Sequence, residues 1–169
     1  MKLNYKYSNI KFEKNTVILA GSGPGSKKLI TLELKYILRL ADVIVYDALV
    51  NKSILEECNE KVLLIYAGKT KKKSCTQTEI NELLVKYAKK GKRVLRLKGG
   101  DVSFFSRAGQ EVKFLKKNKV NFRVISAVTS SQASISQTSE NFFIKKDFVI
   151  LSQDTKKLIR TLKMSIIIM

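Results

Sequence analysis

The 169-residue sequence predicts an α/β protein with an open, mainly parallel sheet and helices on both faces. Short, almost wholly apolar segments alternate along it with longer segments whose apolar residues recur at helical spacing. Strands that are apolar throughout are typical of parallel sheets, because both faces of such sheets are covered. Six of the eight glycines directly follow an expected strand, where the chain must turn towards a helix. The length fits about one domain.

The expected strands are short segments rich in Val, Ile and Leu, which favour the extended backbone. In chain order they are Thr16–Ala20, Asp42–Tyr46, Val62–Tyr66, Arg93–Leu97, Asn121–Ile125 and Phe148–Leu151. The first (TVILA) and the third (VLLIY) have no polar residue in their interior. The first is typical of a buried strand, and near-continuous apolar strands of this kind predict a parallel sheet with both faces covered.

The expected helices occupy the segments between and after these strands. They are Leu29–Ala41, Val50–Cys58, Glu79–Lys90, Gly109–Lys117, Thr129–Gln137 and Lys156–Lys163. The first carries Leu29, Leu32, Ile37 and Leu40 among its apolar positions. In the third, apolar residues at positions 80, 83, 84 and 87 follow the spacing of one helix face, and Gly91 supplies the residue that ends it. The fifth is rich in Ser, Thr, Gln and Ala, which favours a small-residue packing face.

The net charge is +19, from 33 basic and 14 acidic residues. Of the basic residues 27 are Lys and only 6 are Arg, and the longest basic run is Lys71–Lys73. We interpret this charge mainly as compositional bias and solvated helix ends, where the helix dipole favours lysine. A functional anionic partner, a polycarboxylate or a phosphate, is the alternative. Nucleic-acid binding is a weaker interpretation, because Arg residues interleaved with aromatic residues are scarce.

The sequence carries no targeting or metal-binding pattern. The N-terminal residues lack the apolar core of a signal peptide, and no apolar run is long enough to span a bilayer. We therefore expect a cytoplasmic protein with no membrane partner. Cys58 and Cys75 form no CxxC motif and the chain has no His, so we expect reduced thiols, no metal site and no catalytic triad built on an imidazole base.

Glycine-rich or acidic loops follow the expected strands. The loops after the first, third and fourth strands contain GSGPGS, AGKT and KGGD, Asp47 follows the second, and SAVTSS follows the fifth. The carboxyl ends of parallel strands share one edge of an open sheet, so we expect these loops to form one site there. The first loop is neither a G-x-G-x-x-G nor a phosphate loop, and Pro24 removes an amide that a pyrophosphate would use. A ligand held through adenine, ribose and a short charged tail fits better than a dinucleotide.

Longer motifs resemble one enzyme family. The segment VILAGSGPGSKKLITLELKYILRLADVIVYDALV is similar to the opening strand, GxGPGD loop, helix and VxYDxLV strand of the uroporphyrinogen-III C-methyltransferases, within the tetrapyrrole methylases. The segment AGK followed by QTEINELLVKYAKKGKRVLRLKGGD is similar to the family's VGK…PQxEIN…GKxVVRLKGGD block. The resemblance runs from about Val17 to Ser130. Residues 1–15 are polar in composition and are expected to be a lead-in, and the resemblance suggests an N-terminal methylase domain at 16–145 and the start of a truncated second domain at 146–169.

The resemblance implies S-adenosylmethionine as methyl donor and uroporphyrinogen III as substrate, methylated at two pyrrole carbons to precorrin-2 for sirohaem and cobalamin. It also implies a homodimer. By motif matching, Asp47 corresponds to the proposed proton acceptor and Lys69 to the proposed proton donor, although a plain ion pair between them is the alternative. A carboxylate suits the acceptor role, because the methylated ring must lose a proton. The residues that correspond to the family's donor contacts are Pro24, Gly99, Gly100, Asp101, Phe104, Thr129 and Ser130.

Several residues depart from the family pattern. Val102 replaces a Pro, and Ser106 and Ala108 each replace a Gly. Each lost glycine adds a Cβ where the family's backbone bends or touches ligand. Family members carry a second α/β domain, so we expect this chain to self-associate through the apolar run Ile166–Met169 and to methylate slowly or not at all. An inactive remnant that binds a tetrapyrrole or the donor is the alternative.

Overall fold

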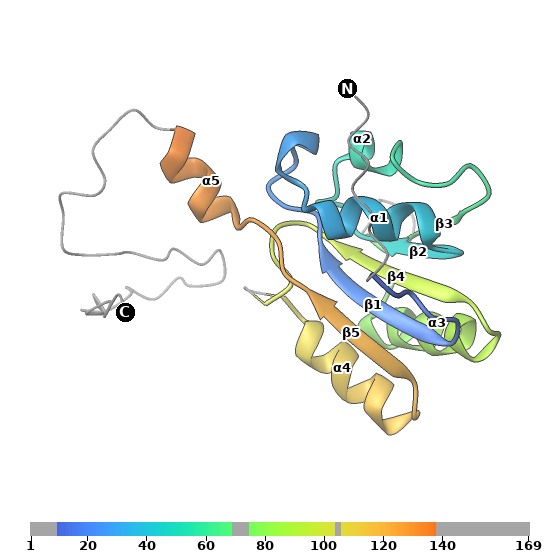
Figure 1. Ribbon diagram of the computed structural model, residues 1–169. Helices are drawn as coiled ribbons and strands as arrows, with labels where there is room; N and C mark the ends of the chain where they lie inside the picture. The colour runs from blue at the N-terminus through green and yellow to red at the C-terminus, as the bar shows by residue number, and fades with distance from the viewer. Residues whose placement is uncertain (1–9, 69–74, 104–105, 138–169) are drawn as a thin grey trace, which may run out of the picture. The chain divides into compact units, whose positions relative to one another are not determined.

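The computed structural model describes residues 10–68, 75–103 and 106–137. The chain divides into two compact units, residues 1–130 and 131–169, and the sheet belongs to the first. This sheet has five parallel strands in the order β3-β2-β4-β1-β5 (Figure 1). The strands are β1 (Thr16–Gly21), β2 (Val43–Tyr46), β3 (Leu63–Tyr66), β4 (Arg93–Lys98) and β5 (Asn121–Ile125). The predicted open parallel sheet is confirmed.

Helices pack against both faces of the sheet. They are α1 (Leu32–Leu40), α2 (Lys52–Leu55), α3 (Gln77–Lys89) and α4 (Ala108–Lys117), with a 3₁₀ turn η1 (Lys27–Leu29) before α1. A further helix, α5 (Ser130–Gln137), follows β5 along the chain. Successive β1 side chains point to opposite faces. Val17 and Leu19 are buried with residues of α3 and α4, whereas Ile18 and Ala20 are buried with residues of α1 and α2. The expected coverage of both faces is therefore confirmed.

Capping residues set the helix starts, and these differ from the expected ones. The Thr31 hydroxyl accepts a hydrogen bond from the Leu34 amide at 3.1 Å, so α1 begins at Leu32 and the expected start at Leu29 is wrong. Similarly, Asn51 caps α2, which covers only part of the expected Val50–Cys58 helix. Thr76 and Glu79 form a reciprocal capping box, and α3 consequently starts two residues before the expected Glu79.

The third strand is more exposed than its sequence predicts. Leu63 and Leu64 are 46% and 42% exposed, and Tyr66 is 38% exposed. The expected coverage of both sheet faces is therefore incomplete at β3. The physical reason is the strand order, which places β3 at one end of the sheet with β2 as its single neighbour.

An ion pair joins β2 to β4 at the amino ends of the strands. Asp42 accepts hydrogen bonds from the Arg93 side chain at 2.8 and 3.1 Å and from the Arg93 amide at 2.8 Å. The Arg93 hydrogen bonds and charge outweigh the effect of burial and hold the pKa of Asp42 below its ordinary value of 3.8.

Some expected features lie outside the described residues. They are the lead-in residues 1–9, the domain boundary at 145, the elements Phe148–Leu151 and Lys156–Lys163, and the run Ile166–Met169. Within the described ranges, no helix is long and apolar enough to cross a membrane.

Candidate active site

The loops after β1 and β4 are joined through their main chains at the carboxyl edge of the sheet. The Gly23 amide donates to the Gly100 carbonyl at 3.2 Å, and the Gly100 amide donates to the Gly23 carbonyl at 2.9 Å. The preceding Ser22 amide donates to the Lys98 carbonyl at 2.7 Å. These bonds hold the GSGPG and KGGD segments side by side as one backbone surface.

Close packing at Gly21 brings the loop after β5 to the same place. A Cβ on Gly21 would lie 2.3 Å from the Gly100 carbonyl oxygen and 2.7 Å from Ala127 Cβ. No side chain fits there, so the glycine is required by space. Three loops, those after β1, β4 and β5, therefore meet at this point.

Asp101 fastens the loop after β5 to the loop after β4. One carboxylate oxygen accepts a hydrogen bond from the Ala127 amide, and the other accepts from the amide and hydroxyl of Ser103. Burial disfavours the charged carboxylate most strongly, but these hydrogen bonds together outweigh it and hold the pKa of Asp101 below its ordinary value of 3.8. Asp101 is thus an ionised, buried anchor of the site.

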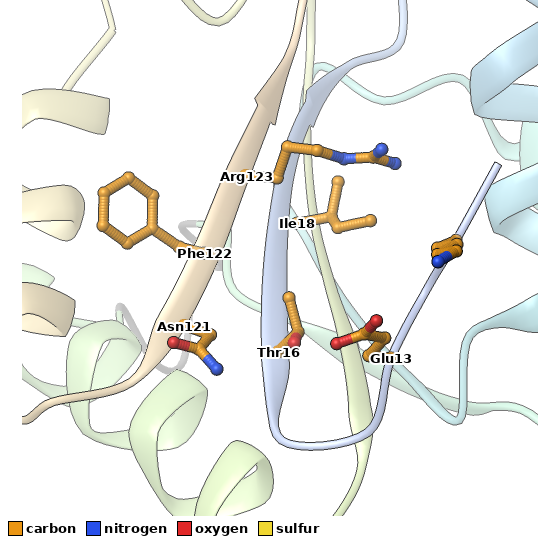
Figure 2. A pocket seen from close by; sticks show the side chains of 7 residues that line it. Glu13, Thr16, Ile18, Asn121, Phe122 and Arg123 are labelled. Carbon is orange, nitrogen blue, oxygen red and sulfur yellow. The ribbon is translucent and has the colours of Figure 1, made fainter. Parts of the chain in front are cut away.

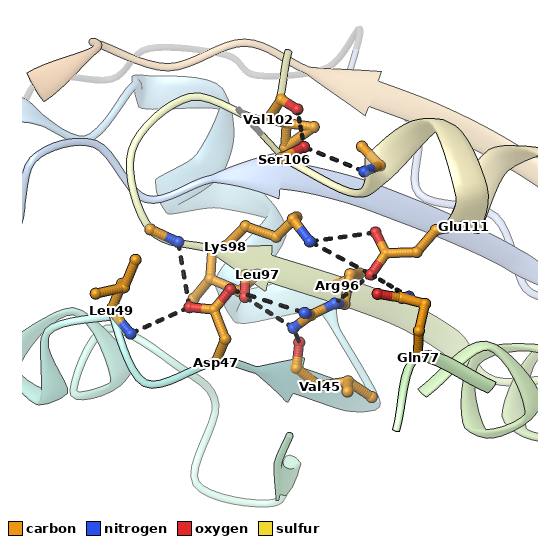
Figure 3. A network of polar contacts seen from close by, with 12 residues as sticks. Val45, Asp47, Leu49, Gln77, Arg96, Leu97, Lys98, Val102, Ser106 and Glu111 are labelled. Carbon is orange, nitrogen blue, oxygen red and sulfur yellow. Dashed lines mark hydrogen bonds and ion pairs between the residues drawn. The ribbon is translucent and has the colours of Figure 1, made fainter. Parts of the chain in front are cut away.

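Asp47, at the end of β2, also reaches the KGGD loop. Its Oδ1 accepts hydrogen bonds from the Leu49 amide at 3.2 Å and from the Gly99 amide at 3.4 Å (Figure 3). Its Oδ2 lies 3.7 Å from Nη2 of the buried Arg96. The backbone of Gly99 passes so close to Leu49 that a Cβ would lie 2.4 Å from Leu49 Cβ.

Asp47 borders a set of charged side chains that we call the buried charge cluster, formed by Arg96, Lys98 and Glu111. Arg96 Nε donates to Glu111 Oε1 at 3.0 Å, and Lys98 Nζ lies 3.4 Å from the same oxygen (Figure 3). Gln77 of α3 donates a longer bond to Glu111, at 3.4 Å. Burial and the Arg96 charge lower the pKa of Lys98 below its ordinary 10.5, against the opposing attraction of Glu111 and Asp47.

Sequence reasoning missed the buried charge cluster. Arg96 and Lys98 alternate with Leu95 and Leu97 in a strand that pairs on both sides. Charged residues in a central strand must be paired when buried, which is the signal that would have pointed to them. Nothing local in the sequence identifies Glu111 as their partner.

The described residues predicted for the site gather at one edge, as expected. Asp47, Gly99, Gly100 and Asp101 make the contacts above, and the half-buried Pro24 lies next to the Gly23–Gly100 bridge. Thr129 is half-buried and Ser130 exposed, and a Cβ on Gly100 would lie 3.9 Å from Ser130 Oγ. Lys69 and Phe104 lie outside the described residues, so the expected pairing of Asp47 with Lys69 stays a prediction.

A departure from the family pattern is accommodated near the site. Ser106, which replaces a Gly, donates a hydrogen bond to the Val102 carbonyl and accepts one from the Ala108 amide at 3.1 Å (Figure 3). Its side chain thereby satisfies an amide at the start of α4 that lacks a helical partner. The Ser106 hydroxyl thus makes two hydrogen bonds, which a glycine has no side chain to make.

A separate cavity of about 370 Å³ lies at the amino ends of β1 and β5 (Figure 2). Its lining residues are Lys11, Glu13, Thr16, Ile18, Asn121, Phe122 and Arg123. The Arg123 guanidinium forms an ion pair with Glu33 at 3.1 Å. None of the predicted site residues that the structure describes lines this cavity. Among the described residues, no three His, Cys, Asp or Glu side chains gather to hold a metal ion.

The chain is thus an α/β protein whose glycine loops and two carboxylates, Asp47 and Asp101, lie together at the carboxyl edge of a parallel sheet, the edge where open α/β sheets bind ligands. Residues 16–164 match the profile of the tetrapyrrole (corrin/porphyrin) methylases. The chain belongs to this family.

The chain is similar to curated members of the family. It is 48% identical over 118 residues to the uroporphyrinogen-III C-methyltransferase of Methanocaldococcus jannaschii, which covers 69% of this chain and 49% of the relative. It is 45% identical over 119 residues to the enzyme of the same name from Bacillus subtilis, covering 70% and 46%. The siroheme synthase of Nitrosomonas europaea is 41% identical over 125 residues, covering 73% and 26%. The chain thus spans about half the length of the curated C-methyltransferases.

Solved structures agree in fold. The uroporphyrin-III C-methyltransferase of Thermus thermophilus superposes with a TM-score of 0.64 at 33% identity, over 72% of this chain and 51% of that one. The same enzyme complexed with S-adenyl homocysteine gives a TM-score of 0.61 at 38% identity, over 70% and 47%. A cobalt precorrin-4 methyltransferase, at 23% identity and a TM-score of 0.66 over 72% and 49%, shares the fold.

Proposed function

We propose that this chain forms the N-terminal part of an S-adenosylmethionine-dependent uroporphyrinogen-III C-methyltransferase, with precorrin-2 as product. The observation that carries the proposal is the Gly23–Gly100 main-chain bridge, which brings the two glycine motifs together beside Asp47 and Asp101. The relatives named uroporphyrinogen-III C-methyltransferase support it, at 45% and 48% identity.

The glycine loops fit a methyl donor. A Cβ on Gly25 or on Gly100 would meet a single atom within 4 Å, at 3.9 Å, so a ligand has room to approach the backbone there. Both glycines have positive φ, 117° and 66°, which turns the loops at the edge of the sheet. Residues proposed to hold the donor are Pro24, Gly99, Gly100, Asp101, Phe104, Thr129 and Ser130. When bound, S-adenosylmethionine supplies an electrophilic methyl group.

Within this proposal the chain positions the reactants and moves protons. Positioning supplies most of the rate of an in-line displacement. Asp47 takes the proton that a methylated pyrrole must lose, and Lys69 returns a proton or pairs with a substrate carboxylate. The tetrapyrrole carries eight carboxylates, which suits a chain with a net charge of +19. We also propose that the protein is a homodimer and is located in the cytoplasm.

A second candidate is a binding domain without catalysis. One observation favours it: both oxygens of Asp47 already face partners, the amides of Leu49 and Gly99 and the Arg96 guanidinium. In this second candidate, Asp47 is a structural residue whose carboxylate serves only to hold the backbone amides and the arginine. The two candidates differ in what happens when Asp47 loses its charge.

Calorimetric titration of the chain with S-adenosylhomocysteine tests the proposed binding, with and without a separately expressed C-terminal part of the Methanocaldococcus jannaschii relative. A Kd near the micromolar range, roughly −8 kcal/mol, is expected when the two parts are mixed, and no heat at millimolar ligand in either arrangement would overturn the proposal.

In the same mixture Asp47→Asn should lower turnover of uroporphyrinogen III about 100-fold or more while donor affinity stays nearly constant, because a general base acts in the transition state. Asp42→Asn, which removes an arginine partner at the other end of the strands, is the matched control. Equal losses of turnover and affinity would make Asp47 a structural residue.

A further inference from the structure

We propose that Glu111 is a positioning residue, which neutralises Arg96 and Lys98 and thereby keeps the Arg96 guanidinium against Asp47. The importance of the Asp47 position rests on the proposed function, whereas the contacts of Glu111, Arg96 and Lys98 rest on geometry alone. Glu111 lies on α4, outside the glycine loops, and corresponds to no residue predicted for the site.

Glu111 is placed to act on both cations at once. Its side chain is fully buried, and Oε1 lies 3.0 Å from Arg96 Nε and 3.4 Å from Lys98 Nζ, while Oε2 lies 3.5 Å from Lys98 Nζ. Gln77 donates to the same carboxylate. A buried carboxylate with three donors around it is a strong local acceptor, because charge-assisted bonds are stronger in a poorly solvated interior.

The charges balance when Glu111 is ionised. Arg96 and Lys98 supply two positive charges, and Glu111 and Asp47 supply two negative ones. Without Glu111, two buried cations would be left with Asp47, whose Oδ2 is 3.7 Å from Arg96. An uncompensated buried charge is unfavourable, so the cluster would rearrange, release a proton or admit water.

The arginine geometry transmits this effect to the site edge. Arg96 Nε is held by Glu111, and Nη1 donates to the carbonyls of Val45 and Leu97 at 3.2 and 3.3 Å. With these atoms fixed, the planar guanidinium presents Nη2 to Asp47. Glu111 therefore sets the direction of the Asp47 carboxylate through Arg96 without touching it.

The test uses the whole chain and nuclear magnetic resonance without any ligand. Glu111→Gln keeps the size of the side chain and removes its charge. We expect the Leu49 and Gly99 amide signals, which report the bonds to Asp47, to shift. We also expect the Lys98 ammonium to titrate at lower pH, because the Glu111 charge opposes the effect of burial. Asp42→Asn is the matched control and should leave both amides unchanged.

The double variant Lys98→Met with Glu111→Gln separates charge balance from shape. It removes one positive and one negative charge, so the amide signals and the urea midpoint should return towards those of the unmodified chain. Unchanged amides in Glu111→Gln would overturn the proposal. The proposal would also be overturned if the amide signals and urea midpoint of the double variant were no nearer to those of the unmodified chain than those of Glu111→Gln. This includes the case in which neither variant folds. If Glu111→Gln alone fails to fold and the double variant folds, charge balance is supported.

These outcomes are independent of turnover. If the amides respond as expected but S-adenosylhomocysteine produces no heat, the proposed function fails and the positioning role of Glu111 stands. If the ligand binds and the amides do not respond, the positioning role of Glu111 fails and the proposed function stands.

Discussion

Gly21 provides a sharp test of the site's packing. In Gly21→Ala, the new Cβ would lie 2.3 Å from the Gly100 carbonyl oxygen, whereas ordinary contacts begin near 3.4 Å. The loop must then move by roughly 1 Å, which breaks the hydrogen bonds between Gly23 and Gly100. Two such bonds at about 1 kcal/mol each, with about 1–3 kcal/mol for overpacking against backbone, give an expected loss of about 3–5 kcal/mol.

Urea unfolding followed by circular dichroism measures this loss as a lower midpoint at unchanged slope. Gly109→Ala is the matched control, because nothing lies within 4 Å of a Cβ there and the residue is in α4. The same substitution should raise stability by about 0.5 kcal/mol at that position, since alanine is the better helix former. A Gly21→Ala variant within about 0.5 kcal/mol of the unmodified chain would refute the packing argument.

Two further predictions concern pH. Asp42→Asn should reduce the free energy of unfolding by about 1 kcal/mol at pH 7. Because bonding to Arg93 lowers the pKa of Asp42, this loss of stability is fully present above pH 3.8 and vanishes as the pH falls through the lower pKa of the folded state. Urea titrations at several pH values measure it. Burial, assisted by the Glu57 charge, raises the pKa of Cys58 to about 11. In a Cys75→Ser variant, alkylation of Cys58 by iodoacetamide, followed by mass spectrometry, should therefore be slow at pH 8 and become about tenfold faster per pH unit. Rapid labelling at pH 8 would contradict this.

The strands were predictable because their signal is local. The predicted strand Asn121–Ile125 coincides with β5, and β1 and β4 each extend one residue beyond the expected end, to Gly21 and Lys98. Those two residues pair with each other across the ladder. Their inclusion depends on a neighbour 77 residues away, which an apolar run does not reveal.

The order of the strands in the sheet was harder to predict from the sequence than the strands themselves. The segment around Leu64 reads as a buried strand by composition, yet β3 lies at the end of the sheet and is partly exposed. Whether an apolar strand is central or at an edge depends on which strands pair with it, and pairing is decided by the whole sheet.

The candidate site was also predictable only in part. Glycine motifs were informative, because positive φ and close backbone approach, as at Gly23 and Gly21, leave few other residues possible. The ion pairs could not be predicted from the sequence. The sequence suggested Lys69 as a partner for Asp47, and the described partner is Arg96, whose own partner Glu111 comes from a helix 15 residues further on. Such pairings arise only when helix and sheet pack.

The strand order also governs what the growing chain can do during synthesis. Both neighbours of β1 are made after it: β4, which pairs Arg93 with Thr16, and then β5. Until residue 93 emerges from the ribosome, the apolar first strand has no sheet partner, and only β2 and β3 can pair. Closing contacts this distant in sequence is slow, and exposed strands are prone to aggregate meanwhile. The nascent chain therefore depends on β4, the strand that also carries Arg96 and Lys98, to assemble its sheet.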